Sequence, residues 1–478
     1  MTEKILFMRD KDVEIVSKNI DKIIDRAIEQ KKQLIGPTNE EYNKIINIIL
    51  NYIKKNNRII YGGYAQNVLI KKKSSKDAFY NEKDHIDIEF YSNKPIEDVV
   101  KLCNILYDNG YKIIQGKPAV HDETYTIFVN FFGYCDIGYM PSNIFYNVMI
   151  ENYKGFKFIH PKFSFVDILR QLTTIIDYER RLEKALTRGK LTMDNYPLEL
   201  TKIKNIIIEK FIPDILKLIA YLIPHICSLN TIMFMGFTAL DVYLNPNKKI
   251  KNQSVVYNNN LIEIVSINLK NDVKKIYNLI IKYFLDNKQI IDDIITTEQY
   301  YPFFQFLDNR IIFKFKGKPI LIIYGHNERC NPYNIVKLIH NDNNYSIKIG
   351  SFNYTFMIIL IKYHLSYINN NKELSNLYDT IMYKLLESRN KFLNKYNYTV
   401  LDKTIFEDFN IDCLGKPVDL QIKFLSSRRN RKLLPKSAIH PYDPEERRNN
   451  YDPDMYYFTN TSGNIINNPK DMIINIKK

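Results

Sequence analysis

Apolar residues recur every three or four positions through residues 11–57, and this spacing predicts amphipathic helices. The pattern forms two blocks, VEIVSKNIDKIIDRAIEQ and EEYNKIINIILNYIKK, separated by the turn-forming segment IGPTN. Helical spacing returns over 96–111, where Gly110 marks the end of the helix, and again over 160–186. Between the helices lie short apolar runs that are typical of strands. The chain is therefore predicted to have an α/β (α+β) fold.

Two of these segments carry residues that a purely structural strand does not need. RIIYGGYAQNVLI, residues 58–70, passes from a strand into two glycines and then into a helix. DHIDIEFYS, residues 84–92, places Asp87 and Glu89 at alternate positions of an apolar strand. Residues i and i+2 of a strand point to the same face, so the two carboxylates are predicted to project together.

A third acidic residue follows in YTIFVNFFGYCDIGYM, residues 125–140, which predicts two strands meeting near Gly133. Asp136 lies on the second of these strands. If that strand lies beside the first acidic strand, three carboxylates converge, and a divalent cation would offset their mutual repulsion. Oxygen ligands of this kind suit Mg²⁺ or Mn²⁺, and a pair of such ions supports phosphoryl transfer. The glycine pair, Gly62 and Gly63, lets backbone amides approach a triphosphate at the start of a helix.

The second half of the chain repeats this plan. IIYGGYAQNVLI, residues 59–70, resembles MFMGFTALDVYL, residues 233–244, at an offset of 174 residues. The matched positions are Gly62 with Gly236, Glu89 with Glu263, Asp87 with Leu261 and, when Gly133 is aligned with Gly317, Asp136 with Ile320. The sequence thus predicts a duplicated unit whose second copy keeps the scaffold and loses two of the three acids. The alternative is chance similarity in a chain rich in Ile and Tyr.

Composition narrows the class of protein. The chain has 478 residues, of which 45% are hydrophobic, enough for two or three globular domains and too many for a disordered protein. No apolar run reaches the roughly 18 residues of a membrane span. Acidic residues near the N-terminus lead us to expect no export signal. Five widely separated cysteines, an odd number, predict reduced thiols in an intracellular protein.

A net charge of +15 favours an anionic partner, with nucleic acid first and an unspecialised basic protein as the alternative. Basic residues are prominent in the C-terminal tail, where SSRRNRKLLPKS, residues 426–437, precedes a tyrosine-rich stretch. Such segments can follow a phosphate backbone and stack bases, although an ordinary solvated surface has the same composition. The residues predicted to contact RNA are Arg428, Arg429, Arg431 and Lys432.

In this order, the glycine pair, the DIE sequence within an apolar strand and the distal Asp136 resemble the nucleotidyltransferase superfamily related to DNA polymerase beta. The Gly-Gly-Tyr turn, IHPKF before a helix and a second half without the paired acids are similar to the poly(A) polymerase catalytic subunits of poxviruses and giant DNA viruses. The resemblance implies a polymerase-beta-like palm, a short mixed sheet backed by helices, followed by a second, degenerate nucleotidyltransferase-like domain. The implied boundaries are 1–57 for an N-terminal helical region, 58–190 for the catalytic domain, 191–395 for the degenerate domain and 396–478 for a basic, Tyr-rich extension.

The activity implied by the resemblance is template-independent adenylyl transfer, in which the 3′-hydroxyl of RNA attacks the α-phosphate of ATP and pyrophosphate leaves. Asp87 and Glu89 match the paired acids that hold two Mg²⁺ or Mn²⁺ ions. Asp136 matches the third acid, which in the family also helps to activate the primer hydroxyl. The alternatives are terminal uridylyl transfer and a non-catalytic RNA-binding scaffold with a relic fold.

Nucleotide-binding residues are predicted on both sides of the acids: Gly62, Gly63, Tyr64, Lys162 and Arg170. Tyr64 stands where the superfamily often has Ser, and this departure puts a phosphate contact by its side chain in doubt. For Lys162 and Arg170, a surface salt bridge is the alternative to a phosphate contact. The 23 residues between Gly63 and Asp87 include KKKSSK, residues 71–76, which suggests an inserted basic loop that touches triphosphate or RNA.

The partners implied by the resemblance are the RNA 3′ end and ATP, with no membrane. Processivity is expected to come from a homodimer, from a separate processivity subunit, as in the poxvirus relative, or from the chain alone. The expected location is intracellular, in the host cytoplasm or the virion of a large DNA virus.

Overall fold

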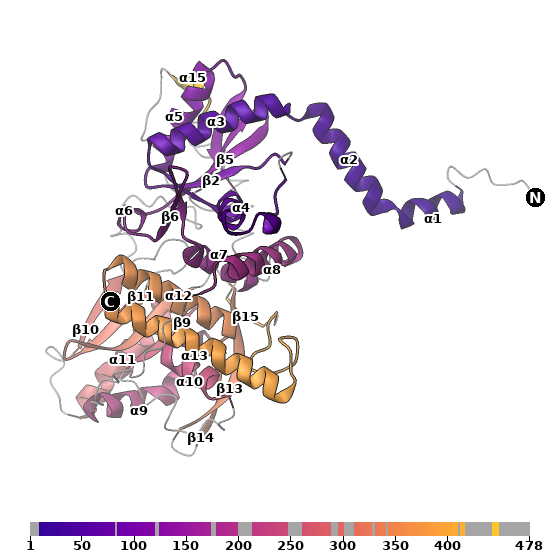
Figure 1. Ribbon diagram of the computed structural model, residues 1–478. Helices are drawn as coiled ribbons and strands as arrows, with labels where there is room; N and C mark the ends of the chain where they lie inside the picture. The colour runs from indigo at the N-terminus through magenta and orange to yellow at the C-terminus, as the bar shows by residue number, and fades with distance from the viewer. Residues whose placement is uncertain are drawn as a thin grey trace, which may run out of the picture.

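Two mixed β-sheets organise the chain, and each forms a unit with its own helices (Figure 1). The first sheet has seven strands in the order β3-β4-β5-β2-β1-β7-β6, and the second has eight in the order β10-β11-β12-β9-β8-β14-β13-β15. The fold class predicted from the sequence is confirmed. The computed structural model describes residues 9–81, 84–119, 124–173, 178–198, 213–246, 261–287, 295–300, 310–326, 330–340, 343–409, 412–415 and 442–448.

The first unit follows two helices, α1 (Asp10–Lys18) and α2 (Ile20–Ile35), which extend away from the sheets as an arm in Figure 1. Its strands are β1 (Ile59–Tyr61), β2 (Ile88–Ser92), β3 (Ile114–Pro118), β4 (Thr124–Val129), β5 (Phe132–Tyr139), β6 (Ile150–Tyr153) and β7 (Phe156–Ile159). Its helices are α3 (Asn39–Lys55), α4 (Gly62–Lys73), the 3₁₀ turn η1 (Ser75–Asp77), α5 (Pro95–Asp108), α6 (Ser142–Phe145), α7 (Pro161–Thr173) and α8 (Tyr178–Asn195).

The second unit repeats the alternation of helices and strands. Its strands are β8 (Ile232–Met235), β9 (Ile262–Ser266), β10 (Ile295–Tyr300), β11 (Arg310–Phe315), β12 (Lys318–Gly325), β13 (Asn331–His340), β14 (Asn343–Gly350) and β15 (Cys413–Leu414). Its helices are α9 (Pro213–Cys227), α10 (Gly236–Leu244), α11 (Leu269–Asp286), α12 (Phe352–Ile368) and α13 (Lys372–Tyr396). A short helix, α15 (Pro444–Arg447), follows near the end of the chain.

The N-terminal helices follow the predicted spacing with one difference. The first predicted block divides at Asn19, which ends α1 with a φ of −114° and whose side chain donates to the carbonyl of Ile15. α3 begins after Thr38, whose hydroxyl accepts the amide of Glu41 at 3.2 Å. Its apolar stripe contacts the sheet, whereas α1 buries none of its residues.

The two sheets share one topology, which confirms the predicted duplication. β1 pairs antiparallel with β2 and parallel with β7, and β2 pairs parallel with β5. β8, β9, β14 and β12 repeat these pairings in the second unit. Backbone geometry also repeats at the predicted offset, because the helix N-caps Tyr61 and Met235 have φ of −135° and −134°. The next residues, Gly62 and Gly236, have φ of +70° and +57°.

The same turn leads from β2 into α5 and from β9 into α11. The hydroxyl of Ser92 accepts the amide of Lys94, and that of Ser266 accepts the amide of Asn268, both at 2.9 Å. Ser92 and Ser266 are 174 residues apart in the sequence, and so are Lys94 and Asn268. The duplication therefore extends past the acidic strand into the following helix.

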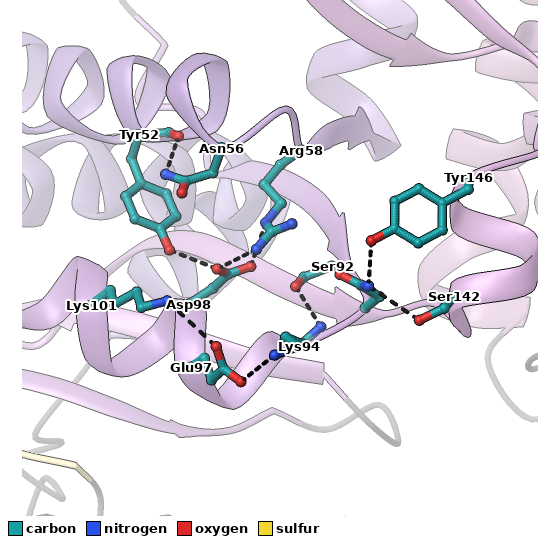
Figure 2. A network of polar contacts seen from close by, with 11 residues as sticks. Tyr52, Asn56, Arg58, Ser92, Lys94, Glu97, Asp98, Lys101, Ser142 and Tyr146 are labelled. Atoms are coloured by element: carbon teal, nitrogen blue, oxygen red, sulfur yellow. Dashed lines mark hydrogen bonds and ion pairs between the residues drawn. The ribbon is translucent and has the colours of Figure 1, made fainter.

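A buried aspartate follows this turn in both units, and Figure 2 shows the first of them, Asp98. Asp98 accepts the hydroxyl of Tyr52 at 2.6 Å and pairs with Arg58, whose Nη2 lies 2.8 Å from Oδ1. The equivalent Asp272 accepts hydroxyls from Thr231 at 2.7 Å and from Ser266 at 2.6 Å. Asp98 is held by its ion pair with Arg58 and Asp272 by two hydroxyls, so both carboxylates anchor the helix that carries them.

Two of the five cysteines form a disulfide, so the prediction of reduced thiols throughout is wrong. Cys330 and Cys413 have Cα atoms 5.3 Å apart, because β13 pairs with β15. They are 83 residues apart in the sequence, which gives no sign of the pairing. The free cysteines are Cys103, Cys135 and Cys227.

The end of the described chain returns to the first unit. Tyr442 and Gly116 of β3 exchange two backbone hydrogen bonds of 2.8 and 2.7 Å, and the Tyr442 hydroxyl donates to Asn104 at 2.6 Å. The described helices include none that is long and apolar enough for a membrane span. The residues predicted to contact RNA, Arg428, Arg429, Arg431 and Lys432, lie outside the described residues.

Candidate active site

Glu89 and Asp136 lie side by side at the centre of the first sheet. β2 and β5 are parallel, and their register pairs Glu89 with Asp136, while β1 places Tyr61 opposite Glu89 from the other side. Asp87 is exposed and comes one residue before β2, two positions from Glu89. The structure thus brings the three predicted acids to one end and one face of the sheet.

The acidic face of the sheet is directed toward the second unit. Ile60 and Phe90 point to the opposite face, where they pack in a core with α3 and α5. Ile59 and Tyr91 point to the acidic face and belong to a core that continues through α7 into the second unit. The candidate site therefore lies where the first sheet meets α7, and not on the outer surface of the unit.

The first turn of α4 holds Glu89. The amide of Gly63 donates to Glu89 Oε2 at 2.7 Å. Gly62 has a φ of +70°, and a Cβ on this residue would lie 1.6 Å from the same oxygen. The close approach of the backbone to the carboxylate therefore requires glycine at position 62.

Burial and mutual repulsion disfavour the ionised forms of the acids. Burial, followed by the negative charge of Asp87, raises the pKa of Glu89 to about 8, against the opposing effect of the Gly63 amide. Burial also raises the pKa of Asp136, although the Thr126 hydroxyl, which donates to Asp136 Oδ1 at 2.5 Å, lowers it. A bound cation would stabilise the ionised forms of both groups.

The three carboxylates do not form a ready-made metal site. Within the described ranges, no three His, Cys, Asp or Glu side chains lie close enough together to hold an ion. The three acids lie on the same part of the sheet, as predicted, but their carboxylates are not close enough together to enclose an ion. This spacing is expected, because like charges repel one another. The all-oxygen donor set of the three carboxylates fits Mg²⁺ or Mn²⁺.

In the second unit, the counterpart of Glu89 is paired with a lysine. Glu263, the counterpart of Glu89, is 2% exposed and forms an ion pair with Lys362 of α12. The Tyr324 hydroxyl donates to Glu263 Oε1 at 3.1 Å. The Tyr324 position corresponds in register to Gly138 of β5, so a large side chain stands where the first unit has none.

The counterpart of Asp136 differs from the one predicted. The register pairs Glu263 with Ile322, whereas alignment of the hairpin glycines predicted Ile320. The difference arises because the glycine of the β11–β12 hairpin lies farther from the paired position than Gly133 does from Asp136. The residue is isoleucine in either case, so the loss of this acid from the second unit is confirmed.

We expect Lys362→Met to destabilise the protein strongly. It leaves Glu263 buried without a counter-charge, and breaking a buried pair by removing one partner costs about 3–5 kcal/mol. Urea unfolding measures the change in the free energy of unfolding. The double variant Lys362→Met with Glu263→Gln is the control and is expected to recover much of the loss. Equal stability of the single and double variants would contradict the ion-pair interpretation.

Two cations on α8 approach the glycine turn, and the sequence analysis did not identify them. A Cβ on Gly63 would lie 2.7 Å from Nη1 of Arg188 and 2.6 Å from the hydroxyl of Tyr80. Arg188 donates to that hydroxyl at 2.8 Å. Loss of solvent and repulsion by Arg188 lower the pKa of Lys184, while Glu89 and Asp87 oppose this shift. The i, i+4 spacing of Lys184 and Arg188 on the helix after the third acid was the available signal.

The other predicted nucleotide-binding side chains lie at different distances from the acids. Tyr64 packs against the apolar core of the first unit. Arg170 pairs with Asp167 at 2.7 Å, and Asp167 lies close enough to raise the pKa values of Glu89 and Tyr91. Arg170 therefore borders the site, whereas Tyr64 contributes to the packing of α4.

Lys162 is engaged at the contact between the two units. Its ammonium pairs with Asp379 of α13 at 2.7 Å and lies 3.7 Å from the centre of the Tyr363 ring. His364 Nε2 donates to the Lys162 carbonyl at 3.1 Å. The ion pair is about nine-tenths buried, which holds the ammonium away from solvent.

His364 is expected to make the unit contact sensitive to acid. Burial lowers the pKa of His364 to about 3. Between about pH 3 and pH 6.5, the unfolded chain therefore binds a proton at this ring and the folded protein does not. The stabilisation is full above an unfolded pKa of about 6.5 and is lost by up to about 1.4 kcal/mol per pH unit as the pH falls toward 3. Unfolding measured from about pH 7 to 4 should show a weaker pH dependence for His364→Gln. An identical pH profile for the variant would contradict the buried neutral ring.

Comparison with known proteins agrees with this geometry. The family "Poly(A) polymerase catalytic subunit" matches residues 47–177, and the family described as "APMV, Putative poly(A) polymerase, catalytic subunit, C-terminal" matches residues 238–476. The chain is 32% identical to the "Putative poly(A) polymerase catalytic subunit" of Acanthamoeba polyphaga mimivirus, over 97% of this chain and 84% of that protein. An African swine fever virus protein of the same description is 28% identical over 37% of this chain and 38% of its own length.

A solved structure covers nearly the whole chain. It is described as the crystal structure of the Megavirus polyadenylate synthase, and it matches with a TM-score of 0.79 and 32% identity over 98% of this chain and 95% of that chain. These relatives come from large DNA viruses. By this similarity over most of its length, the chain belongs to the poly(A) polymerase catalytic subunit family.

Proposed function

We propose that the first unit of this poly(A) polymerase catalytic subunit transfers AMP from ATP to the 3′ end of RNA, with Asp87, Glu89 and Asp136 as its acidic residues. The contrast between the two units carries the proposal. Burial and the charge of Asp87 raise the pKa of Glu89, whereas Glu263 forms an ion pair with Lys362. The three acids would hold two Mg²⁺ or Mn²⁺ ions, which when bound supply the positive charge that phosphoryl transfer needs.

Asp136 is the proton acceptor in this proposal. Its Oδ1 accepts the Thr126 hydroxyl, which orients the carboxylate and leaves Oδ2 for the RNA 3′-hydroxyl. As Oδ2 takes the proton, the 3′ oxygen bonds to the α-phosphorus of ATP, the bond from that phosphorus to the bridging oxygen breaks, and pyrophosphate leaves. Burial raises the pKa of Asp136, which makes it a stronger base.

In this proposal, the glycine turn and α8 bind the triphosphate. Gly62 and Gly63 open α4, whose N-terminus favours anions. Arg188 lies beside Gly63, and Lys184 is one helical turn earlier on α8. These groups supply positive charge on the side of the acids where pyrophosphate departs. Arg170 is a further candidate, because its partner Asp167 acts on the acids.

Nucleotide selection tests the proposal. Single-nucleotide incorporation on one RNA primer should be compared for ATP, UTP, CTP and GTP in the presence of Mg²⁺ or Mn²⁺. We expect ATP to be preferred and pyrophosphate to be released in equal amount. Preference for UTP would replace the adenylyl assignment by terminal uridylyl transfer, and the absence of any incorporation would favour a binding scaffold.

The proposed partners are the RNA 3′ end and ATP, and the proposed location is the host cytoplasm or the virion. A homodimer and a separate processivity subunit stay predictions. Mass in solution, measured together with tail length under primer excess, distinguishes them. Long tails made by a species of twice the chain mass would favour the homodimer, and short tails made by a monomer would favour a missing subunit.

A further inference from the structure

Four lysines and two tyrosines from separate segments form a strip along the β6 edge of the first unit. Lys72 at the end of α4 and Lys154 in the β6–β7 turn both lie 5.3 Å from the centre of the Tyr153 ring. Lys73 lies 5.4 Å from the centre of the Tyr196 ring. Lys54, at the end of α3, reaches the same turn, since its Cε lies 3.0 Å from where a Cβ on Gly155 would be. We call these residues the lysine–tyrosine strip: Lys54, Lys72, Lys73, Lys154, Tyr153 and Tyr196.

The segments that form the strip are strongly basic. Residues 54–55, 71–76 and 151–157 contain eight lysines and one acidic residue, Glu151. Among the residues that the structure describes, Lys72 pairs with Glu151 at 2.5 Å, whereas no carboxylate lies within 4.0 Å of the ammonium groups of Lys54, Lys73 or Lys154. Crowded cations repel one another, so an anionic ligand lowers the electrostatic free energy of this surface.

The strip is separate from the triphosphate site. The sequence predicts an inserted basic loop at 71–76, but Lys71, Lys72 and Lys73 continue α4 as its last turn. A rise of about 1.5 Å per residue puts Lys72 roughly 14 Å along the helix from Gly63. The lysines at the end of α4 therefore lie about two and a half helical turns from the glycine turn, at a distance that fits a polyanion extending beyond the reacting 3′ end.

We propose that the lysine–tyrosine strip binds the single-stranded RNA upstream of the 3′ end. The strip has the two features that non-specific single-strand sites combine, a row of cations for phosphates and aromatic rings for bases. Both rings, Tyr153 and Tyr196, are partly exposed beside lysines. The inference rests on the proposed function for its choice of RNA and adds the surface along which the acceptor strand is held.

Salt-dependent RNA binding tests the strip in the full chain. The variant Lys54→Gln, Lys73→Gln, Lys154→Gln leaves the Lys72–Glu151 pair in place. The matched control is Lys274→Gln, Lys275→Gln, Lys282→Gln, which removes the same charge from the exposed face of α11 in the second unit. Anisotropy of a labelled unstructured RNA is measured in EDTA over a range of KCl concentrations, and thermal unfolding checks that all three proteins are folded.

We expect the strip variant to lose about 0.7 from the slope of log K against log[KCl] for each lysine, or roughly 2 in total, and to bind about tenfold or more weakly at about 0.1 M KCl. The α11 variant should change affinity by no more than about twofold. Equal slopes for the strip variant and the wild type, or equal losses in the two variants, would overturn the inference. If the wild type adds AMP to RNA in that case, only the strip fails; a wild type that adds none removes the proposed function itself.

Discussion

Asp136→Asn and Asp87→Ala are each expected to abolish AMP addition while leaving RNA binding largely in place. Each change removes an oxygen ligand from the acidic face, and Asp136→Asn also removes the proposed proton acceptor. Loss of electrostatic stabilisation and loss of a general base are each worth about 10²–10⁴ in rate, so we expect a fall of about 10³-fold or more. Single-turnover extension of a labelled RNA primer with ATP measures the effect.

Asp84→Asn is the matched control for these variants. Asp84 is exposed, lies in the same segment as Asp87 and accepts the amide of Asn81 at 2.7 Å. Its substitution by Asn removes one negative charge, as each of the two test variants does. Asp84 lies four residues before the first residue of β2, three residues farther from that strand than Asp87. We expect close to wild-type rates for this variant. Wild-type rates in Asp136→Asn or Asp87→Ala would remove these acids from the chemistry, as would an equal loss in Asp84→Asn.

Gly62→Ala is expected to inactivate the enzyme because it displaces the carboxylate of Glu89, and not only because it disturbs nucleotide binding. The added Cβ would lie 1.6 Å from Glu89 Oε2, so the carboxylate must leave the Gly63 amide. The φ of +70° adds backbone strain of about 1–3 kcal/mol for any residue with a side chain. We expect AMP addition to fall by about 10²-fold or more, as for the loss of other preorganised groups. Primer extension and thermal unfolding are measured on the same samples.

Gly110→Ala separates the clash from the strain. Gly110 has a φ of +88°, but a Cβ there would meet no atom within 4 Å. We expect this variant to lose stability through backbone strain and to keep its rate of AMP addition. The claim that activity requires the glycine turn to hold Glu89 would be contradicted by either of two results. In one, both variants lose activity in proportion to their loss of stability; in the other, Gly62→Ala stays active.

Local patterns predicted the scaffold of the catalytic unit well. The run of IIY into two glycines became β1 and the first turn of α4, and the alternation around Glu89 became β2. Both features depend on residues that are neighbours in the sequence, where periodicity and turn chemistry act directly. The repeat at an offset of 174 added long-range information, because two copies of one topology must pair their strands alike.

Contacts between distant segments could not be predicted from the sequence. Arg188 reaches Gly63 and Tyr80 only because α8 packs on α4, and Lys162 meets Asp379 across 217 residues. Ile322 replaced Ile320 as the counterpart of Asp136 because hairpin length, and not the position of a glycine, sets the register. Lys362, which neutralises Glu263, lies on α12, where most of the neighbouring residues are buried and apolar.

Manganese binding by the full chain tests whether the acids of the first unit hold the ions for AMP transfer. Electron paramagnetic resonance counts bound Mn²⁺ in the presence of a non-hydrolysable ATP analogue. We expect ions to bind to the wild type and this binding to be lost in the double variant Asp87→Ala, Asp136→Asn. Undiminished Mn²⁺ binding by a folded double variant would contradict this role of the acids.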